Sequence, residues 1–289
     1  MTVYPEELRG QVDAYLESLG FDGRDSTAGL QEAMRYSLLA GGKRIRPVLC
    51  LATGRAVGAD PAQLLPTAAA IELIHTYSLI HDDLPAMDDD ALRRGRPTSH
   101  VVHGEDVAIL AGDALFAEAM RLIAERQQAE PGRVLRAIRE IAAATGVDGM
   151  VGGQYVDVTE GGNDAAALRE LHSLKTGRLI VASVRAALLL TGTHDSQAEP
   201  YERFAEELGV LFQIVDDILD VTGSDEELGK PSGSDERHGK LTYVSLFGLE
   251  HARELARQSH AGARAALAEA GGETGELASI ADFIYTRDA

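Results

Sequence analysis

The chain has 289 residues, of which 45% are hydrophobic and 25% charged, a balance typical of a soluble globular protein with a large core. Its formal net charge of −19 argues against nucleic acid or an anionic membrane surface as a partner, because either would need a basic face. A single cysteine, Cys50, excludes an internal disulfide and a cysteine-rich zinc site.

The apolar runs give no sign of export or membrane insertion. The first residues, Met1 to Glu7, lack a basic stretch followed by an apolar one, which is the pattern of a secretory signal. The longest apolar run, Leu179 to Thr191, is interrupted by Arg185 and is too short to cross a bilayer. We therefore expect a cytoplasmic protein without stable membrane insertion.

Helical periodicity dominates the chain, and no run of alternating strands is visible. Breaks fall at glycine and proline, and no Pro/Ser-rich linker divides the chain into two compositions. We therefore predict an all-α fold, as one domain over residues 1–289. The expected helices cover Glu6–Leu19, Thr27–Ala40, Pro47–Val57, Ala62–Ile80, Ala108–Ala124, Arg133–Ala144, Ala165–Leu190, Tyr201–Asp220, Tyr243–Ala270 and Glu276–Thr286.

One longer connection, Val221 to His238, carries glycine, serine and charge in place of apolar periodicity. Loops of this length inside compact domains are often lids over functional sites, and a surface insertion has the same composition. Both interpretations stay open at this point.

An acidic segment, His81 to Asp90, directly follows a mostly apolar helical run that ends at Ile80. Five of its ten side chains are carboxylates, which repel one another unless water screens them or cations lie among them. A solvated acidic loop is the simpler interpretation of such a segment taken alone.

A second acidic cluster favours a cation site instead. Asp216 and Asp220 are four residues apart, so on a helix they project within about 40° of each other, and Asp217 lies about 100° from Asp216. Gln213 lies three residues before Asp216 and joins the same face. Because the flanking residues are apolar, we predict a core helix whose acidic stripe lines a cavity.

Clusters that offer only oxygen ligands select hard cations, so we predict Mg²⁺ or Mn²⁺ bound together with a phosphorylated substrate. The chain has four lysines, each beside glycine or threonine, at Lys43, Lys175, Lys230 and Lys240. A compact ammonium beside small residues suits contact with phosphate oxygens. The acidic clusters and the lysines together predict a site that holds and neutralises a diphosphate.

These motifs make the chain resemble the short-chain trans-polyprenyl diphosphate synthases, above all the bacterial farnesyl and geranylgeranyl diphosphate synthases. The resemblance runs nearly end to end. It is carried in order by Gly41–Pro47, His75–Asp90 with Arg93–Thr98, Gly152–Asp157, Lys175–Gly177, and Gln213–Asp220 with Gly229–Lys230 and Gly239–Tyr243. The chain departs from the family pattern at Ala91 and Val244, where an acidic residue and a proline are usual. The resemblance implies a large helical bundle around a central cavity, the isoprenoid synthase fold, and a homodimer.

The resemblance also implies roles for individual residues. Three Mg²⁺ ions, for which Mn²⁺ would substitute, are expected on Asp82, Asp83, Asp88, Asp216, Asp217 and Asp220. The allylic diphosphate, dimethylallyl or geranyl, is expected on Arg93, Lys175, Thr176, Gln213, Lys230 and Lys240; Lys175, Thr176 and Gln213 are the candidate catalytic residues. Isopentenyl diphosphate is expected on Lys43, Arg46, His75 and Arg94.

Pro85 fits this assignment, because uninterrupted helix would place Asp82 and Asp88 about 240° apart and proline lets the chain leave the helix. The implied reaction is prenyl transfer. The allylic diphosphate leaves, the isopentenyl double bond attacks the cation, and the released diphosphate is thought to accept the proton that is lost. A carbocation requires a cavity that excludes water, so the segment from Val221 to His238 is a candidate lid.

Product length in the related enzymes depends on side chains just before the first aspartate motif. Here these are Tyr77 and Ser78, five and four residues before Asp82. An aromatic at this place resembles the bacterial farnesyl pattern, so we predict farnesyl diphosphate as the main product, since pocket volume sets chain discrimination. Geranylgeranyl diphosphate is the alternative product.

Simpler interpretations exist for several of these residues. His75 on an apolar helix is ordinarily a satisfied core histidine, and Arg93 to Arg96 is able to cap a helix end. His100 and His103 have no third ligand nearby, which argues against zinc.

Three other functions are consistent with an acidic helical protein. A class I terpene cyclase shares metal-triggered ionisation, but its second metal motif usually mixes Asn, Ser and Glu. A non-catalytic synthase subunit generally loses aspartates from one motif, and both motifs are intact here. A plain acidic helical scaffold is the third alternative.

Overall fold

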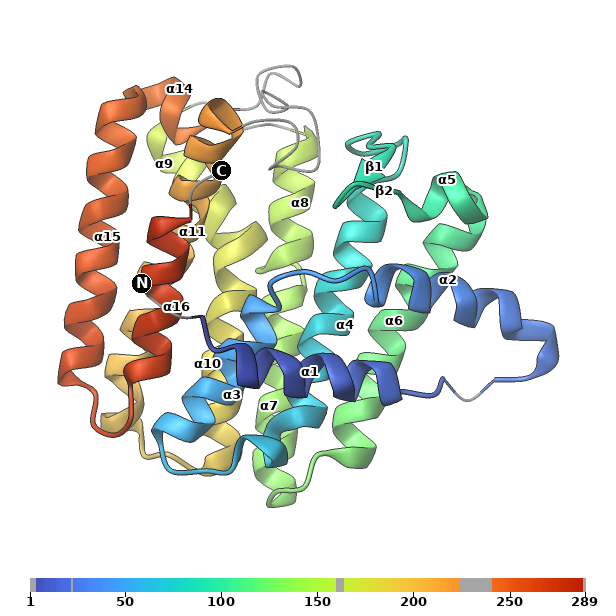
Figure 1. Ribbon diagram of the computed structural model, residues 1–289, viewed down its shortest axis with the longest axis horizontal. Helices are drawn as coiled ribbons and strands as arrows, with labels where there is room; N and C mark the ends of the chain where they lie inside the picture. Colours follow the sequence, from blue (N-terminus) through green and yellow to red (C-terminus); the bar gives the residue numbers. More distant parts are fainter. Residues whose placement is uncertain (1–3, 22, 160–163, 224–240, 288–289) are drawn as a thin grey trace.

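The computed structural model describes residues 4–21, 23–159, 164–223 and 241–287, and within them the fold is almost entirely helical, which confirms the predicted all-α class (Figure 1). The α-helices are α1 Glu6–Ser18, α2 Ala28–Leu38, α3 Ile45–Ala56, α4 Leu65–Asp82, α5 Ser99–His103, α6 Glu105–Arg126, α7 Pro131–Thr145, α8 Met150–Thr159, α9 Ala165–His172, α10 Arg178–Thr191, α11 Asp195–Thr222, α14 Tyr243–Phe247, α15 Leu249–Glu269 and α16 Gly275–Thr286. Three short turns of other helix types are η1 Asp25–Thr27, η2 Pro61–Leu64 and η3 Ser173–Gly177.

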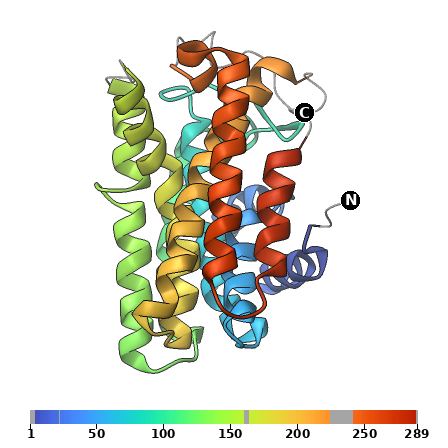
Figure 2. The same cartoon turned by 90° about the vertical axis from the view of Figure 1, so that its left-hand side faces the viewer.

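The longer helices run roughly alongside one another, whereas α1 and α2 lie across them (Figures 1 and 2). Helix α4 packs against α3 and α6, and α11 packs against α10 and α15. Nearly every residue of α4 from Pro66 to Ile80 is buried, as expected of a helix that is apolar almost all round. No helix in the described ranges is long and apolar enough to cross a bilayer.

A buried ion pair ties α4 to the start of α3. Arg44 is 4% exposed, and it donates to the carboxylates of Glu72 at 2.7 Å and Asp13 at 2.9 Å and to the carbonyl oxygen of Leu38 at 2.9 Å. The charge is therefore fully partnered within the core, as buried charges must be. Within the Gly-Gly-Lys-Arg segment, Arg44 therefore stabilises the fold.

Two predicted long helices are interrupted. The expected helix Ala165–Leu190 is two helices, α9 and α10, joined by the π-helical turn η3. The expected helix Tyr243–Ala270 is divided at Gly248, whose φ of 78° is a conformation that glycine adopts without strain. Each predicted helix was wrong in being continuous. The apolar periodicity of the sequence continues across η3 and across Gly248, so it does not reveal either interruption.

Other boundaries also differ. Helix α11 starts at Asp195, earlier than the predicted Tyr201, and it continues through Pro200, which lacks the N–H that would donate to the carbonyl oxygen one turn earlier. Helix α8 was not predicted, since Gly152 and Gly153 lower the helix propensity of its sequence.

A two-stranded hairpin, β1 Leu92–Arg93 and β2 Arg96–Pro97, was also missed. Arg94 and Gly95 form its two-residue turn with φ values of 54° and 70°, which match a turn that favours glycine and tight hairpins. Arg93 to Arg96 therefore turns a hairpin, and the helix-cap interpretation is wrong.

Candidate active site

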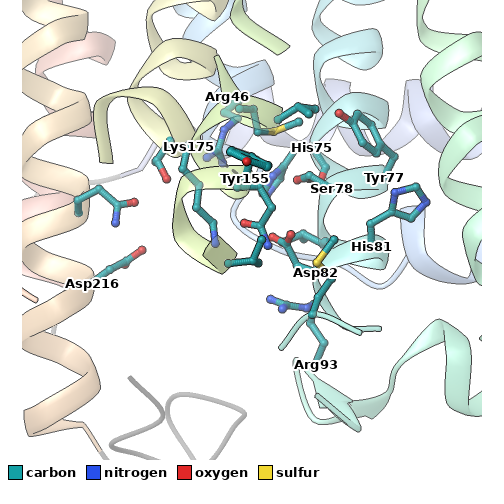
Figure 3. Close-up of a pocket in the computed structure, with 18 of the residues that line it drawn as sticks. Arg46, His75, Tyr77, Ser78, His81, Asp82, Arg93, Tyr155, Lys175 and Asp216 are labelled. Atoms are coloured by element: carbon teal, nitrogen blue, oxygen red, sulfur yellow. Dashed lines mark hydrogen bonds between the residues drawn. The ribbon is translucent and has the colours of Figure 1, made fainter. Parts of the chain in front are cut away.

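A cavity of about 530 Å³ opens between α4, α8, η3 and α11 (Figure 3). Most of its wall is apolar, with charged side chains on two sides. The lining residues are Arg46, His75, Tyr77, Ser78, Leu79, His81, Asp82, Met87, Arg93, Arg94, Met150, Val151, Gln154, Tyr155, Val158, Lys175, Thr176, Phe212, Gln213 and Asp216.

The first aspartate motif divides its residues between the cavity and the protein interior. Asp82 ends α4 and lines the cavity, whereas Asp83 is buried beside it and accepts hydrogen bonds from Arg93 at 2.6 and 2.7 Å. The helix ends before Pro85, as predicted, and the backbone N–H of Asp88 donates to the Asp82 carbonyl oxygen at 2.9 Å. The motif thus folds back on itself in a tight turn.

The second aspartate motif, on α11, also has residues both at the cavity and in the protein interior. Asp216 lines the cavity and forms an ion pair with Arg287 near the end of the chain. Asp217 is buried and accepts a 2.7 Å hydrogen bond from the Tyr243 backbone N–H, and Asp220 is also buried away from the cavity lining. Of the predicted acidic stripe, Asp216 is therefore the aspartate that lines the cavity in the described part of the chain. Asp217 projects about 100° from Asp216, and Asp220 lies one helical turn further along the same face, beyond the lining.

Asp82 and Asp216 lie on opposite sides of the cavity, on α4 and α11 (Figure 3). Burial raises the pKa of Asp82 to about 6, which shows a carboxylate with little compensation for lost hydration. No group of three metal-ligating side chains is assembled in the part of the chain described here. The donors are nevertheless oxygens on both walls, and this chemistry fits a hard divalent cation that bridges to a ligand in the cavity.

Three of the four residues predicted for isopentenyl diphosphate come together. Arg46 Nη1 lies 3.4 Å from His75 Nε2, and Arg94 lines the same cavity. Burial, followed by the positive charges of Arg46 and Arg94, lowers the pKa of His75 well below its usual value, so its imidazole is neutral. His75 is therefore a cavity residue that offers a hydrogen bond and no charge.

The hairpin turn holds Arg94 against the glycine pair that precedes α3. Its guanidinium donates to the Gly41 carbonyl oxygen, and a Cβ on Gly42 would lie 2.6 Å from Arg94 Cζ. The flexible Arg94 side chain could move aside, but the Gly42 φ of 127° is a backbone conformation that favours glycine. Lys43 does not line the cavity; its Nζ lies 5.0 Å from the centre of the Phe283 ring.

Lys175 and Thr176 lie on the π-helical turn η3 and line the cavity. Such turns occur often at functional sites, since they displace side chains from the helical pattern. Lys175 Nζ forms a 2.7 Å ion pair with Asp157 of α8. Gln213 lines the cavity from α11, whereas Lys230, Lys240 and most of the segment from Val221 to His238 lie outside the described residues.

Tyr77 and Ser78 both line the cavity on the α4 side. Tyr77 is 9% exposed, and its ring makes edge contacts with Phe116 and His81 at centroid distances of 5.6 and 5.7 Å. Ser78 Oγ donates to the His75 carbonyl oxygen at 2.8 Å. Tyr77 is thus fixed by packing from α6 and from the next turn of α4.

Several lining and neighbouring residues had no predicted role. Gln154, Tyr155 and Asp157 belong to the segment Gly152–Asp157, which is part of the family resemblance. The resemblance predicts that this segment lies near the site and does not predict the contacts of its individual residues. Phe212 has the Arg287 guanidinium 4.5 Å from its ring centre, and that of Arg46 at 5.8 Å. Nothing in the local sequence of Arg287 indicates this contact.

The chain matches a family model described as Polyprenyl synthetase over residues 27–274. It is 47% identical over 279 residues to a farnesyl diphosphate synthase of Geobacillus stearothermophilus, covering 95% of this chain and 92% of that one. It is 52% identical over 232 residues to the chloroplastic geranylgeranyl pyrophosphate synthase 7 of Arabidopsis thaliana, covering 78% of this chain and 67% of that protein.

The fold is likewise similar to a solved structure. A geranyltransferase from Helicobacter pylori, described as complexed with magnesium and isoprenyl diphosphate, superposes with a TM-score of 0.83 at 31% identity. The similarity covers 96% of this chain and 93% of that one.

Proposed function

Because this chain belongs to the polyprenyl synthetase family, we propose that it is a prenyltransferase that joins isopentenyl diphosphate to dimethylallyl or geranyl diphosphate. The observation that carries the proposal is the placement of Asp82 and Asp216 across one cavity, with the Lys175 side chain pointing into the space between them (Figure 3). Anionic oxygens on both walls and a cation between them suit a diphosphate that arrives with metal ions.

The proposed metal is Mg²⁺, which the Helicobacter pylori relative holds, with three ions and replacement by Mn²⁺ as further parts of the proposal. Asp82 and Asp216 would hold it, supported by Asp83, Asp88, Asp217 and Asp220 from the same motifs. When bound, Mg²⁺ stabilises the negative charge that develops on a departing diphosphate.

The basic residues divide into two proposed sets. Arg46, His75 and Arg94 line one part of the cavity and would bind isopentenyl diphosphate, with Lys43 reaching it from outside the lining. Arg93, Lys175, Thr176 and Gln213 would bind the allylic diphosphate, with Lys230 and Lys240 joining from the segment outside the described residues.

The proposed reaction breaks the bond between the allylic carbon and the diphosphate oxygen. The isopentenyl double bond then attacks that carbon, and the proton lost from the isopentenyl unit passes to the released diphosphate. Lys175 and Arg93 hold the leaving group, and the apolar wall around Tyr77 surrounds the hydrocarbon and excludes water. Neutral His75 orients the second diphosphate through a hydrogen bond.

Farnesyl diphosphate is the proposed main product, because the buried Tyr77 ring lines the cavity on the α4 side and would limit the length of the hydrocarbon there. Geranylgeranyl diphosphate is the second candidate, favoured by the 52% identity to a geranylgeranyl pyrophosphate synthase. Product analysis of the purified protein with dimethylallyl and isopentenyl diphosphates decides between fifteen and twenty carbons.

We also propose that residues 1–289 act as one domain and assemble as a homodimer. Large apolar side chains that do not line the cavity are exposed on the adjoining helices α5, α6 and α7, at Val101, Val102, Ile109, Leu110 and Leu135. An exposed apolar surface of this kind suits a second copy of the chain. Light scattering should give twice the monomer mass for the wild type and a lower mass for Leu110→Glu, and a monomeric wild type would contradict the proposal. The cytoplasmic location stays a prediction.

The decisive experiment measures Mg²⁺-dependent diphosphate release. Release that requires both an allylic substrate and isopentenyl diphosphate supports the synthase. Release with the allylic substrate alone would instead identify a terpene cyclase, and no release would favour the non-catalytic subunit or the scaffold.

A further inference from the structure

The ion pair between Asp157 and Lys175 joins α8 to the π-helical turn that carries two candidate catalytic residues. The Asp157 Oδ2 to Lys175 Nζ distance is 2.7 Å, and the side chains are 9% and 24% exposed. Charged hydrogen bonds at this length and degree of burial are stronger than exposed surface pairs. Asp157 is thus in a position to determine where the Lys175 ammonium lies.

Close backbone packing reinforces this arrangement. A Cβ on Gly153 would lie 2.3 Å from the Lys175 backbone nitrogen, and a Cβ on Gly209 of α11 would lie 3.1 Å from Gly177 Cα. The turn η3 is therefore held between α8 and α11, and its backbone has little freedom. Because Gly153 and Asp157 are four residues apart, the same face of α8 contacts the backbone of the turn and the ammonium of its lysine.

Lys175 also acts on the opposite wall. Its side chain points into the space between Asp82 and Asp216 (Figure 3). Without Asp157, the flexible four-carbon side chain of Lys175 would bring its ammonium to these carboxylates. Such a contact would occupy the oxygens that are proposed to bind metal.

We propose that Asp157 is a positioning residue that holds the Lys175 ammonium between the two walls without an ion pair to Asp82, and yields it to the allylic diphosphate when that substrate binds. The inference rests on the proposed function of the cavity. It assigns Asp157 no contact with the reacting atoms. Its effect on substrate binding passes through Lys175, so removing Asp157 should change that binding little when Lys175 is absent.

The test compares Asp157→Asn with Glu276→Gln. The control removes the carboxylate of another partly buried pair, Glu276 with Arg55 at 2.7 Å, which does not line the cavity. For Asp157→Asn we expect a rise of about tenfold in KM for the allylic substrate and in the Mg²⁺ concentration required, the size expected for one charged hydrogen bond. KM for isopentenyl diphosphate should stay within about twofold. Glu276→Gln should change none of the three.

A double-mutant cycle separates positioning from a merely structural role. In a Lys175→Met background, Asp157→Asn should add less than about twofold to the loss, because the two residues act as one unit. Additive losses, or an unchanged KM and Mg²⁺ requirement in the single variant, would overturn the proposal. Asp157→Glu keeps the charge and moves it by one methylene, so it retains the ion pair. We therefore expect it to raise KM for the allylic substrate and the required Mg²⁺ concentration less than Asp157→Asn does.

Calorimetry of Mg²⁺ with inorganic diphosphate gives a readout that does not depend on turnover. Asp157→Asn should bind the pair about tenfold more weakly than the wild type and Glu276→Gln, and equal binding would refute the inference. A wild type that binds diphosphate but transfers no prenyl group would refute the proposed function, and the binding comparison would still decide the role of Asp157.

Discussion

Truncation of Tyr77 to alanine should lengthen the product. The Tyr77 ring lies between the cavity and Phe116 of α6, with His81 at its other edge. Removing the ring would enlarge the cavity on the α4 side, where the apolar wall is proposed to surround the hydrocarbon. We expect the main product of Tyr77→Ala to contain at least one additional five-carbon unit.

The magnitude follows from burial. Five additional carbons buried at about 0.8 kcal/mol each would favour further elongation by up to roughly 4 kcal/mol, which is ample to reverse a product ratio. The substitution also costs the fold about 3 kcal/mol, since a 9% exposed aromatic loses its packing and two edge contacts. The assay therefore belongs well below the melting temperature of the variant.

The assay is chromatography of the dephosphorylated products after incubation with dimethylallyl and isopentenyl diphosphates. Tyr77→Phe is the matched control, because it keeps the ring and should keep the product. Phe116→Ala probes the next side chain behind Tyr77. An unchanged product distribution in Tyr77→Ala, with the variant folded and active, would show that another residue closes the cavity.

Further predictions concern the fold and the metal. Glu72→Gln should lower the free energy of unfolding by about 3 kcal/mol in chemical denaturation, because it leaves the buried Arg44 guanidinium with one carboxylate fewer. Gly153→Ala should reduce activity more than tenfold, since its Cβ would overlap the Lys175 backbone, and a crystal structure should show η3 displaced. Asp216→Asn should abolish the response to added Mg²⁺ in calorimetry while the helical circular dichroism is kept. Burial lowers the pKa of His172 to about 4, so protonation of the unfolded chain should cost about 2 kcal/mol of stability between pH 7.5 and 5. His172→Phe should lose less stability than the wild type over this interval, and equal losses would contradict that pKa.

The sign of the His172 effect follows from where each state binds its proton. The unfolded histidine has its ordinary pKa near 6.5 and protonates as the pH falls through that value, whereas the folded one stays neutral to about 4. Stability is therefore unaffected by this group above about pH 6.5, declines below it, and levels off below about pH 4.

The sequence predicted that the two acidic clusters share one cavity, and Asp82 at the end of α4 and Asp216 within α11 both line the same cavity. The sequence pattern did not distinguish these two cavity-lining aspartates from the aspartates next to them. Asp83 and Asp217 turn to Arg93 and to the Tyr243 backbone, and these partners come from other parts of the chain. Contacts of this kind depend on tertiary packing, which local periodicity does not encode.

The same limit explains the other differences. The hairpin has a local signal, because Gly95 readily adopts the positive φ that its two-residue turn requires. The π-helical turn has no distinctive composition. The contact of Arg287 with Asp216 joins residues that are far apart in sequence, and neither has a local signal for the other.

The turn η3 also makes the site sensitive to a change of chain length by a single residue. A π-helical turn is equivalent to one residue inserted into a continuous α-helix, so deleting one residue before Lys175 would let α9 and α10 merge without interruption. Each residue of an α-helix advances by about 100°, and the deletion would therefore rotate one helix relative to the other by that angle. If α10 stays in the core, it is α9 that must leave its place against α8 and α14. The spacing between Asp157 and Lys175 is thus fixed by residue count as well as by chemistry.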